Sequence, residues 1–321
     1  MKRLCHCKGV KYMNILVSGA SGFMGSHLCP FLTGLGHDLT GLDSKNCDLT
    51  RPESLERFRG RPYDLIFHLA AWTRAGDFCM RHPAEQWVIN QRLNTNMVDW
   101  WQKAQPQAKF VFIGTSSAYA PGSDLKEADY MAGVPHESLR GYGMSKRMLL
   151  EGAYAMSSQY GLKWLCAVSS ALYGRGYHLD GRQMNFVFDL IRKIIRGREY
   201  GEKVILWGDG FQKREAMLVD DFINNLWRLT QNHENEIFNI GTGAQYSIRD
   251  FAAVICELVG YDPLAIEYDV SRYSGAASKC LNIDKILKNL PEYRLTPLKE
   301  GLARTIEWFY ERRAFNIEIA G

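Results

Sequence analysis

The 321-residue sequence predicts an α/β protein, a doubly wound parallel sheet with a smaller, discontinuous α/β lobe. Short apolar runs alternate with segments in which apolar residues recur about every 3.6 positions, the pattern of strands joined by helices. A glycine-rich turn directly follows the first apolar run. After Gly174 the alternation loosens into shorter strands and amphipathic helices, which indicates a lobe built onto the sheet.

Five apolar runs in the first half are the predicted strands of the sheet. Parallel strands need crossover connections, so helices between these runs predict right-handed βαβ units. The first connection has apolar residues on one helix face, namely Leu28, Phe31, Leu32 and Leu35. The predicted strands comprise residues 15–17, 39–43, 65–70, 110–115 and 164–169.

The second half predicts further helices and strands. Ser247 and Asp250 have the spacing of a capping box at a helix start, and Pro297 marks the first turn of the last helix. Strands are expected at 204–207 and 237–240, and a helix at 221–230. One more helix buries a face made of Val187, Leu190, Ile191, Ile194 and Ile195.

Three parts of the chain are predicted from this pattern. Residues 1–12 are basic and aperiodic, and we interpret them as an N-terminal extension. Residues 13–172, together with about 214–242, form the predicted sheet domain. The predicted substrate lobe comprises about 173–213 and 243–316.

Composition and charge are those of a folded globular chain. Hydrophobic residues make up 46% and charged residues 23%, which argues against disorder and coiled coil. Lys and Arg exceed Asp and Glu by 39 to 35, without a basic run suited to a phosphate backbone, so we expect no nucleic-acid partner. The sequence lacks an apolar stretch near the roughly 18–20 residues of a membrane helix. It also lacks a signal peptide, so we expect no membrane association and a cytoplasmic location.

The eight cysteines lack paired spacing, which predicts reduced and mostly buried thiols. Cys5, His6 and Cys7 form a cluster at the amino terminus. This cluster has no distant partner to complete a tetrahedral site, so we expect no bound metal.

The glycine-rich turn predicts a dinucleotide site. Glycines between a strand and a helix permit a tight turn and let backbone N–H groups approach a pyrophosphate. Asp43 ends the second predicted strand 18 residues after Gly25, where a carboxylate can bind the adenosine ribose and repel a 2′-phosphate. We therefore predict a Rossmann-type domain that binds NAD in preference to NADP. The predicted contacts here are Gly19, Gly22, Phe23, Met24, Gly25 and Asp43.

Tyr142 and Lys146 form the predicted catalytic pair. They are four residues apart at the start of a predicted helix, hence on one helix face. Lys146 and an oxidised nicotinamide are both positive and would lower the pKa of the phenol, so that Tyr142 could act as a general base. Thr115 ends the preceding strand, where its hydroxyl can bind the substrate oxygen and relay the proton.

The glycine spacing, the strand end at Thr115 and the Tyr142/Lys146 pair resemble the extended short-chain dehydrogenase/reductase family. This family comprises the NAD-dependent nucleotide-sugar epimerases, dehydratases and reductases. The resemblance runs from about Asn14 to Trp308 and implies a nucleotide-diphosphate sugar as substrate, with Thr115, Tyr142 and Lys146 catalytic. It also implies cofactor contacts at Asp48, Leu69, Ala70, Ala71, Asn90 and Asn96.

Ser116 and Ser117 bear on the reaction type. The family's 4,6-dehydratases are similar here but carry Asp and Glu, whereas its fucose-synthase-like members carry Cys at the second position, paired with a His. The matching positions in this chain are Ser117 and Asn185. A hydroxyl needs an activator to act as a general acid or base. Dehydration by that route and 3,5-epimerisation are therefore not expected. A dehydratase that takes its acid from another segment, such as those of Arg74, His178 or Asp180, stays an open alternative.

The resemblance also assigns residues to the substrate. Asn185, Arg214 and Arg272 would bind the diphosphate, for which the planar guanidinium fork is well suited. Ser116 and Ser117 would face the sugar. Trp72 and Arg74 follow the Ala-Ala pair and would narrow the sugar pocket or bind an anion, with core packing as the alternative for Trp72. His178 is interpreted as a hydrogen-bonded or surface residue.

The leading functional prediction is an NAD-dependent nucleotide-sugar 4-epimerase that works through a transient 4-keto intermediate. An NAD(P)H-dependent keto-sugar reductase, or another oxidoreductase of the family, is the alternative. A non-catalytic dinucleotide sensor is the second alternative. The resemblance also implies a homodimer through the helices near Trp100-Trp101 and after Lys146. The tryptophan pair, which is too wide to bury wholly on one helix face, favours the same prediction.

Overall fold

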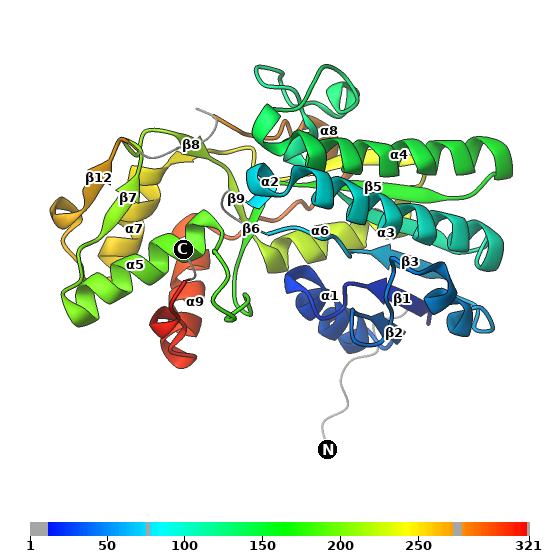
Figure 1. The fold of residues 1–321 in the computed structure, drawn as a ribbon, viewed down its shortest axis with the longest axis horizontal. Helices are drawn as coiled ribbons and strands as arrows, with labels where there is room; N and C mark the ends of the chain where they lie inside the picture. The colour runs from blue at the N-terminus through cyan, green and yellow to red at the C-terminus, as the bar shows by residue number, and fades with distance from the viewer. Residues whose placement is uncertain (1–11, 75–77, 272–277, 320–321) are drawn as a thin grey trace.

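A six-stranded sheet lies at the centre of the structure, a computed structural model that describes residues 12–74, 78–271 and 278–319. Its strands run parallel in the order β2-β1-β3-β4-β5-β10 (Figure 1). The order reverses between β1 and β3, and in sheets of this kind ligands bind beyond the carboxyl ends of the strands at such a reversal. The strands are β1 (Asn14–Ser18), β2 (Asp38–Leu42), β3 (Leu65–His68), β4 (Lys109–Thr115), β5 (Trp164–Ser169) and β10 (Glu236–Ile240).

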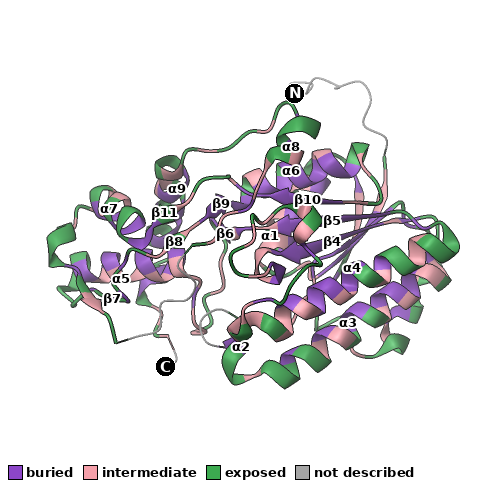
Figure 2. Ribbon diagram, turned by 90° about the horizontal axis from the view of Figure 1, so that it is seen from above, coloured by how far each residue is buried: buried purple, intermediate pink, exposed green. Residues whose placement is uncertain are grey.

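Helices cover both faces of this sheet because successive strand residues point to opposite sides. Phe110 and Phe112 of β4 pack with α3 and α4, whereas Val111 and Ile113 pack with α1 and α6. Figure 2 shows α3 and α4 side by side, with exposed residues on their outer faces. The predicted doubly wound sheet is confirmed. The helices of this part are α1 (Phe23–Gly34), α2 (Phe78–Arg81), α3 (Pro83–Ala104), α4 (Arg140–Tyr160), α6 (Val219–Asn232) and α8 (Asp284–Asn289).

A smaller lobe with its own apolar core lies beside the sheet (Figure 1). The five apolar residues predicted for one helix face are all buried in α5, and the capping box of Ser247 and Asp250 is present in α7. β6 (Ala171–Tyr173) and β9 (Ala216–Leu218) pair with each other between the lobe and the sheet. The lobe contains α5 (Phe186–Tyr200), α7 (Ile248–Val259), α9 (Leu298–Glu311), β7 (Ile205–Trp207), β8 (Lys213–Arg214), β11 (Tyr246–Ser247) and β12 (Glu267–Asp269).

Short 3₁₀ turns connect several of these elements. The turn η2 directly follows β4 and precedes α4 along the chain. The described turns are η1 (Pro52–Phe58), η2 (Ser116–Ala118), η3 (Glu127–Asp129), η4 (Glu137–Leu139), η5 (Pro263–Ala265) and η6 (Ala314–Asn316). The predicted domain boundaries stay a prediction, although α6 and β10 do return the chain to the sheet as expected.

The structure corrects three expectations. Leu35 lies just after α1 and is 38% exposed, because the helix ends at Gly34 and Gly36 turns the chain with a φ of +88°. Pro297 precedes the first residue of α9 instead of standing within its first turn.

The tryptophan pair is the third correction. Trp100 and Trp101 are both buried within the chain, Trp100 packed with Tyr63 and Trp101 stacked on Phe110 with its Nε1 donating to the Ala108 carbonyl. Their width therefore gives no support to a dimer. The homodimer through α3 and α4 stays a prediction.

Cysteines, metals and membrane spans can be checked over the described residues. Six cysteines there are free thiols, four of them buried, as predicted. The same residues contain no group of three side chains placed to hold a metal ion, and Cys5-His6-Cys7 lies outside them. None of the described helices is long and apolar enough to cross a membrane.

Candidate active site

The glycine-rich turn forms a cradle between β1 and α1. Gly19 has a φ of +72°, and a Cβ atom on Gly25 would overlap the Gly19 carbonyl and lie 2.6 Å from the carbonyl oxygen of Ala20. The helix starts after Gly22, which has no side chain to cap it, and its first turn lacks acidic residues. Its free N–H groups and positive dipole end suit a pyrophosphate. The cradle thus fits a dinucleotide.

Phe23 and Met24 contribute to this site through their position at the helix start. The Phe23 ring packs edge-on against Tyr177 and Phe188 of the smaller lobe, at 5.3 and 5.7 Å between ring centres. Met24 packs on the core under the sheet. Their side chains therefore fix the helix end between the two cores, and their backbone amides remain the groups suited to a phosphate.

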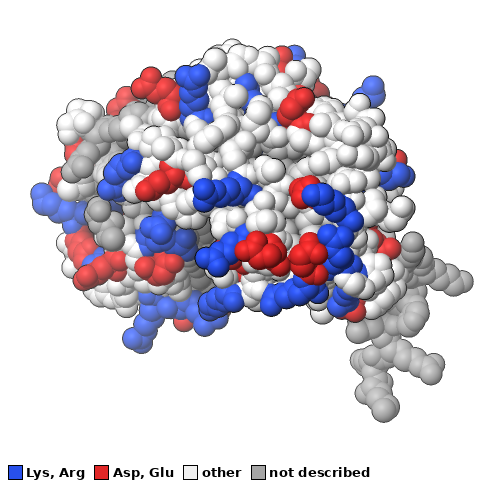
Figure 3. All heavy atoms as spheres, turned by 45° about the vertical axis from the view of Figure 1, so that its right-hand side comes forward, with Lys and Arg blue, Asp and Glu red and all other residues white. Residues whose placement is uncertain are grey.

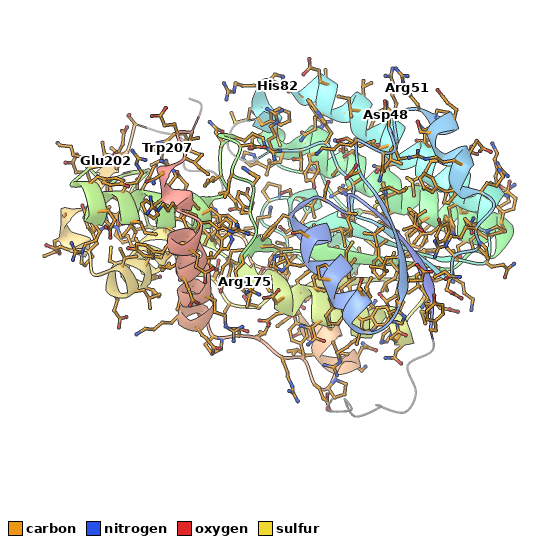
Figure 4. The ribbon with its side chains drawn as sticks, turned by 90° about the horizontal axis from the view of Figure 1, so that it is seen from below. Asp48, Arg51, His82, Arg175, Glu202 and Trp207 are labelled. Atoms are coloured by element: carbon orange, nitrogen blue, oxygen red, sulfur yellow. The ribbon has the colours of Figure 1, made fainter. Side chains whose placement is uncertain are left out.

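Asp43 and Asp48 lie beyond the end of β2. The Asp43 carboxylate accepts hydrogen bonds from the backbone N–H groups of Lys45 and Asn46, at 2.9 and 3.1 Å. Asp48 accepts two hydrogen bonds from Thr50, which lower the pKa of its carboxyl, and lies 3.5 Å from the Arg51 guanidinium (Figure 4). Asp48 is therefore held ionised, and hydrogen bonds fix both carboxylates in place. Their contacts with adenosine stay a prediction.

The segment after β3 lies against the glycine cradle. A Cβ atom on Gly19 would be 2.8 Å from the backbone nitrogen of Ala70, and that N–H lies 3.4 Å from the Ser18 hydroxyl. Leu69 is buried, whereas Ala70 and Ala71 are half-buried. This placement is consistent with the predicted contacts of residues 69–71 with a dinucleotide.

The side-chain amides of Asn90 and Asn96 bind the protein backbone. Asn90 both accepts from the N–H of Trp72 and donates to its carbonyl, each at 2.9 Å, and Asn96 donates to the Leu49 carbonyl at 2.8 Å. Asn90 therefore positions the segment at Trp72. A direct contact of either amide with the cofactor stays a prediction.

Thr115, Tyr142 and Lys146 meet at the carboxyl end of β4. Thr115 is buried, and its hydroxyl accepts a 3.2 Å hydrogen bond from the N–H of Ser117. A Cβ atom on Gly143 would lie 2.8 Å from the Ser117 carbonyl, so the residue after Tyr142 touches the turn after Thr115. Lys146 Nζ is 6.0 Å from the centre of the Tyr142 ring. The structure thus brings the three predicted residues together.

Burial dominates the electrostatics of this group. It lowers the pKa of Lys146 to about 8 and raises the pKa of the Tyr142 phenol well above its ordinary value. The predicted lowering of the phenol pKa by Lys146 is therefore not seen in the chain alone. Lys146 keeps most of its charge at neutral pH, so it can still stabilise a phenolate once a second positive group is present.

A series of buried, hydrogen-bonded side chains lies under the cradle and was not predicted from the sequence. His68 Nδ1 is 2.7 Å from the Ser18 hydroxyl, and its Nε2 is 3.1 Å from the side-chain oxygen of Asn94. Asn94 donates in turn to the carbonyl of Ser145. Burial and the charge of Lys146 lower the pKa of His68 to about 3, so the imidazole is neutral. These hydrogen bonds link β1, β3, α3 and α4 beneath the site.

Arg147 was also missed. It follows Lys146, is buried, and donates to the carbonyl of Ala118 at 2.5 Å. Its other hydrogen bonds go to the carbonyls of Met131, Ala132 and Gly133. One guanidinium therefore fastens η2 to α4.

Lys279 is a third residue that local motifs did not reveal. Its Nζ donates a 2.8 Å hydrogen bond to the Ser117 hydroxyl. The buried carboxylate of Glu215 holds the segment in place by accepting from the N–H groups of Leu281 and Gly243, at 2.8 and 3.0 Å. Lys279 follows Ser117 by 162 positions, so only the folded chain brings the two together.

The predicted substrate residues lie on several segments. Asn185 directly precedes α5, Arg214 ends β8 beside Glu215, and Ser116 begins η2. Arg272 lies outside the described residues. Trp72 packs on Phe78 with 4.8 Å between ring centres, which agrees with the packing alternative. His178 Nδ1 is 3.3 Å from Asp180, and burial lowers the pKa of its ring.

Arg74 lines a pocket of about 540 Å³ near the carboxyl end of the described chain. Its guanidinium lies 5.3 Å from the ring centre of Phe78. Figure 3 shows Lys and Arg side chains interspersed with Asp and Glu on the face in view. The pocket lining comprises Arg74, Phe78, Arg81, His82, Asp180, Gly181, Arg182, Gln183, Glu318 and Ile319.

Comparison with known proteins places the chain in a family. A sequence model of the NAD dependent epimerase/dehydratase family matches residues 15–241. The chain is 26% identical over 310 residues to a GDP-L-fucose synthase of Sinorhizobium fredii, covering 94% of this chain and 97% of the relative.

Two solved structures share the fold. A UDP-glucose 4-epimerase of Thermotoga maritima with UDP-glucose has a TM-score of 0.81 at 25% identity, covering 94% of this chain and 100% of the other. A GDP-mannoheptose C4 reductase of Campylobacter jejuni with NADP bound has a TM-score of 0.80 at 21% identity, with the same coverage. The chain is therefore an enzyme of the NAD dependent epimerase/dehydratase family, and its cofactor is an NAD(P) dinucleotide.

Proposed function

We propose that this enzyme interconverts a hydroxyl and a ketone at C4 of a nucleoside-diphosphate sugar, and that it acts as an NAD-dependent 4-epimerase. The convergence of Thr115, Tyr142 and Lys146 beside the glycine cradle carries this proposal. When bound, the dinucleotide removes hydride from the sugar carbon and can return it to the other face of the ketone.

The side chains of the site have separable roles in this reaction. Thr115 donates a hydrogen bond to the substrate oxygen, and Tyr142 takes and returns the hydroxyl proton. Lys146 stabilises the phenolate that forms, because its ammonium is charged at neutral pH and lies on the same helix face. The neutral His68 beneath them adds no competing charge.

We assign the diphosphate to Arg214 and Arg272, with Asn185 at the start of α5. Guanidinium groups donate paired hydrogen bonds to phosphate oxygens, which makes arginine the suitable residue. Ser116, Ser117 and Trp72 would then lie on the sugar side, and we place Arg74 at its outer end.

Asp43 supports NAD over NADP, because its carboxylate at the end of β2 would repel a 2′-phosphate. The reductase is the second candidate, since the Campylobacter enzyme of the same fold is a C4 reductase with NADP bound. We expect Asp43→Ser to narrow the preference for NAD over NADP by about 10-fold or more, about 1.4 kcal/mol in binding. Equal preference in both proteins, measured by titration, would count against this role.

Product analysis tests the proposal directly. The purified enzyme is examined for bound dinucleotide and incubated with UDP-glucose, UDP-galactose and GDP-mannose, and with GDP-4-keto-6-deoxymannose plus NADPH. The epimerase predicts inversion at C4 without net use of dinucleotide. The reductase predicts consumption of NADPH with the keto sugar. Tyr142→Phe should bind dinucleotide but lose turnover in either case. Dinucleotide binding without turnover of any compound would favour the sensor instead.

A further inference from the structure

The backbone N–H of Thr115 lies past the end of the strand that would otherwise bind it. β3 ends at His68, which pairs with Phe112, so the last three residues of β4 extend beyond β3 and pair with β5. The N–H of Lys109 donates to the carbonyl of Asp64 on the β3 side. Thr115 follows Lys109 by an even number of positions, so its N–H points to the same side. Because Thr115 is buried, this N–H needs a partner from outside the sheet.

The phenol of Tyr130 supplies that partner. Its hydroxyl oxygen accepts a 3.2 Å hydrogen bond from the N–H of Thr115. Gly114 leaves room for the phenol, because a Cβ atom there would lie 2.9 Å from the Tyr130 hydroxyl. The segment that follows Tyr130 is fixed by Arg147, which donates to the carbonyls of residues 131–133. Tyr130 therefore reaches the end of β4 from an anchored loop.

Tyr130 cannot take part in proton transfer near neutral pH. Burial raises the pKa of the Tyr130 phenol well above its ordinary value, and the neighbouring Cys166, Tyr119 and Tyr142 raise it further. The ring of Tyr119 packs edge-on against that of Tyr130, with 5.2 Å between ring centres, and helps to hold it in place. Any effect of the Tyr130 hydroxyl on the reaction must therefore pass through the position of Thr115.

We propose that Tyr130 is a positioning residue for the reaction at C4, because its hydroxyl fixes the Thr115 backbone and thereby aims the Thr115 hydroxyl at the sugar oxygen. This inference rests on the proposed function, in which Thr115 donates to that oxygen. Without the phenol, the strand end would shift to find another partner for its buried N–H. A displacement of about 1 Å at a reacting group lowers the rate by about 100-fold.

A double-mutant cycle separates this role from general packing. Tyr130→Phe keeps the buried ring and removes the hydroxyl, so kcat should fall by about 10- to 100-fold while KM and dinucleotide affinity stay unchanged. In a Thr115→Val enzyme, Tyr130→Phe should lower kcat no further, because the hydroxyl that Tyr130 positions is already absent. Turnover is measured with UDP-glucose, UDP-galactose, GDP-mannose, and GDP-4-keto-6-deoxymannose plus NADPH.

Tyr119→Phe is the matched control. Tyr119 is also a buried tyrosine of this cluster, but its hydroxyl donates to Asn239 Oδ1 at 2.7 Å instead of binding the strand end at Thr115. Removing that hydroxyl should lower the free energy of unfolding and leave kcat unchanged.

Amide hydrogen exchange tests the hydrogen bond without any turnover. Exchange of the Thr115 N–H with D₂O is followed by NMR in the protein with dinucleotide bound. It should be at least about 10-fold faster in Tyr130→Phe than in Tyr119→Phe, or about 1.4 kcal/mol, because only the first change removes the acceptor of this N–H.

The outcomes distinguish this inference from the proposed function. Equal Thr115 exchange rates in the two tyrosine variants overturn the inference, whatever the enzyme turns over. An unchanged kcat in Tyr130→Phe also overturns it, as does a loss of kcat that is equally large in the Thr115→Val enzyme. Failure of the unaltered enzyme to turn over any of the compounds overturns the proposed function, and this inference with it.

Discussion

Replacing Arg147 with methionine should weaken both the fold and the reaction. The guanidinium donates to four carbonyls, of which that of Ala118 is buried while those of residues 131–133 belong to exposed residues. An orphaned buried carbonyl costs about 1–3 kcal/mol, and each carbonyl that can turn to water costs about 0.5 kcal/mol. Methionine keeps the apolar stem packed. We therefore expect the free energy of unfolding to fall by about 3 kcal/mol.

The same change should release η2 from α4. A displacement of about 1 Å at Thr115 or Ser117 lowers kcat about 100-fold, whereas dinucleotide binding at the glycine cradle should persist. Urea unfolding and steady-state turnover measure the two effects, with Arg198→Met, an exposed arginine of α5, as control. An Arg147→Met enzyme with full stability would refute the hydrogen-bond reasoning. An unchanged kcat with reduced stability would show that Arg147 contributes to stability but not to the reaction.

Two further predictions concern the cradle and the lobe junction. Gly25→Ala should weaken dinucleotide binding by 10-fold or more, about 1.4 kcal/mol or more, because its Cβ would overlap the Gly19 carbonyl; unchanged affinity by calorimetry would contradict this. Both ring nitrogens of His27 lie within hydrogen-bonding distance of an oxygen. Nδ1 is 2.7 Å from Asp220 Oδ1, and Nε2 is 2.8 Å from the Arg175 carbonyl oxygen. Burial disfavours the charged ring, but these hydrogen bonds prevail and raise its pKa. The stability that the charged ring contributes is fully present below the unfolded-state pKa of about 6.5, and it is lost as pH rises through the folded-state pKa. His27→Gln should therefore lower the free energy of unfolding more at pH 6 than at pH 8.5. An equal loss of urea stability at both pH values would argue against a charged His27.

The sheet could be predicted closely because all its strands except the edge strand β2 are buried on both faces. Such strands are continuous apolar runs. No predicted strand end of the sheet differs from the observed end by more than two residues. The third strand ends at His68 instead of Ala70, since the chain there leaves the sheet to cross Gly19. Tertiary contacts at the cradle, absent from any local pattern, determine that end.

The meeting of Thr115, Tyr142 and Lys146 could be predicted because their spacing is local. Tyr142 and Lys146 share a helix face, and Thr115 ends the strand beneath them. Arg147, His68 and Lys279 carry no such signal, since their partners are carbonyls and hydroxyls on distant segments. The neighbours of Ser117 in the sequence do not include Lys279, and only the folded chain reveals that this lysine donates to the Ser117 hydroxyl.

Glu215 has a consequence for the order in which the enzyme becomes complete. Synthesis proceeds from the amino terminus, and folding tends to follow it. The glycine cradle and the residues through Lys146 emerge from the ribosome long before Leu281, whose N–H docks on the Glu215 carboxylate. A nascent chain could therefore capture its dinucleotide while the Ser117 hydroxyl still lacks its amine. The last stretch of the polypeptide would then complete the proposed sugar site after the first half has formed the cradle for the cofactor.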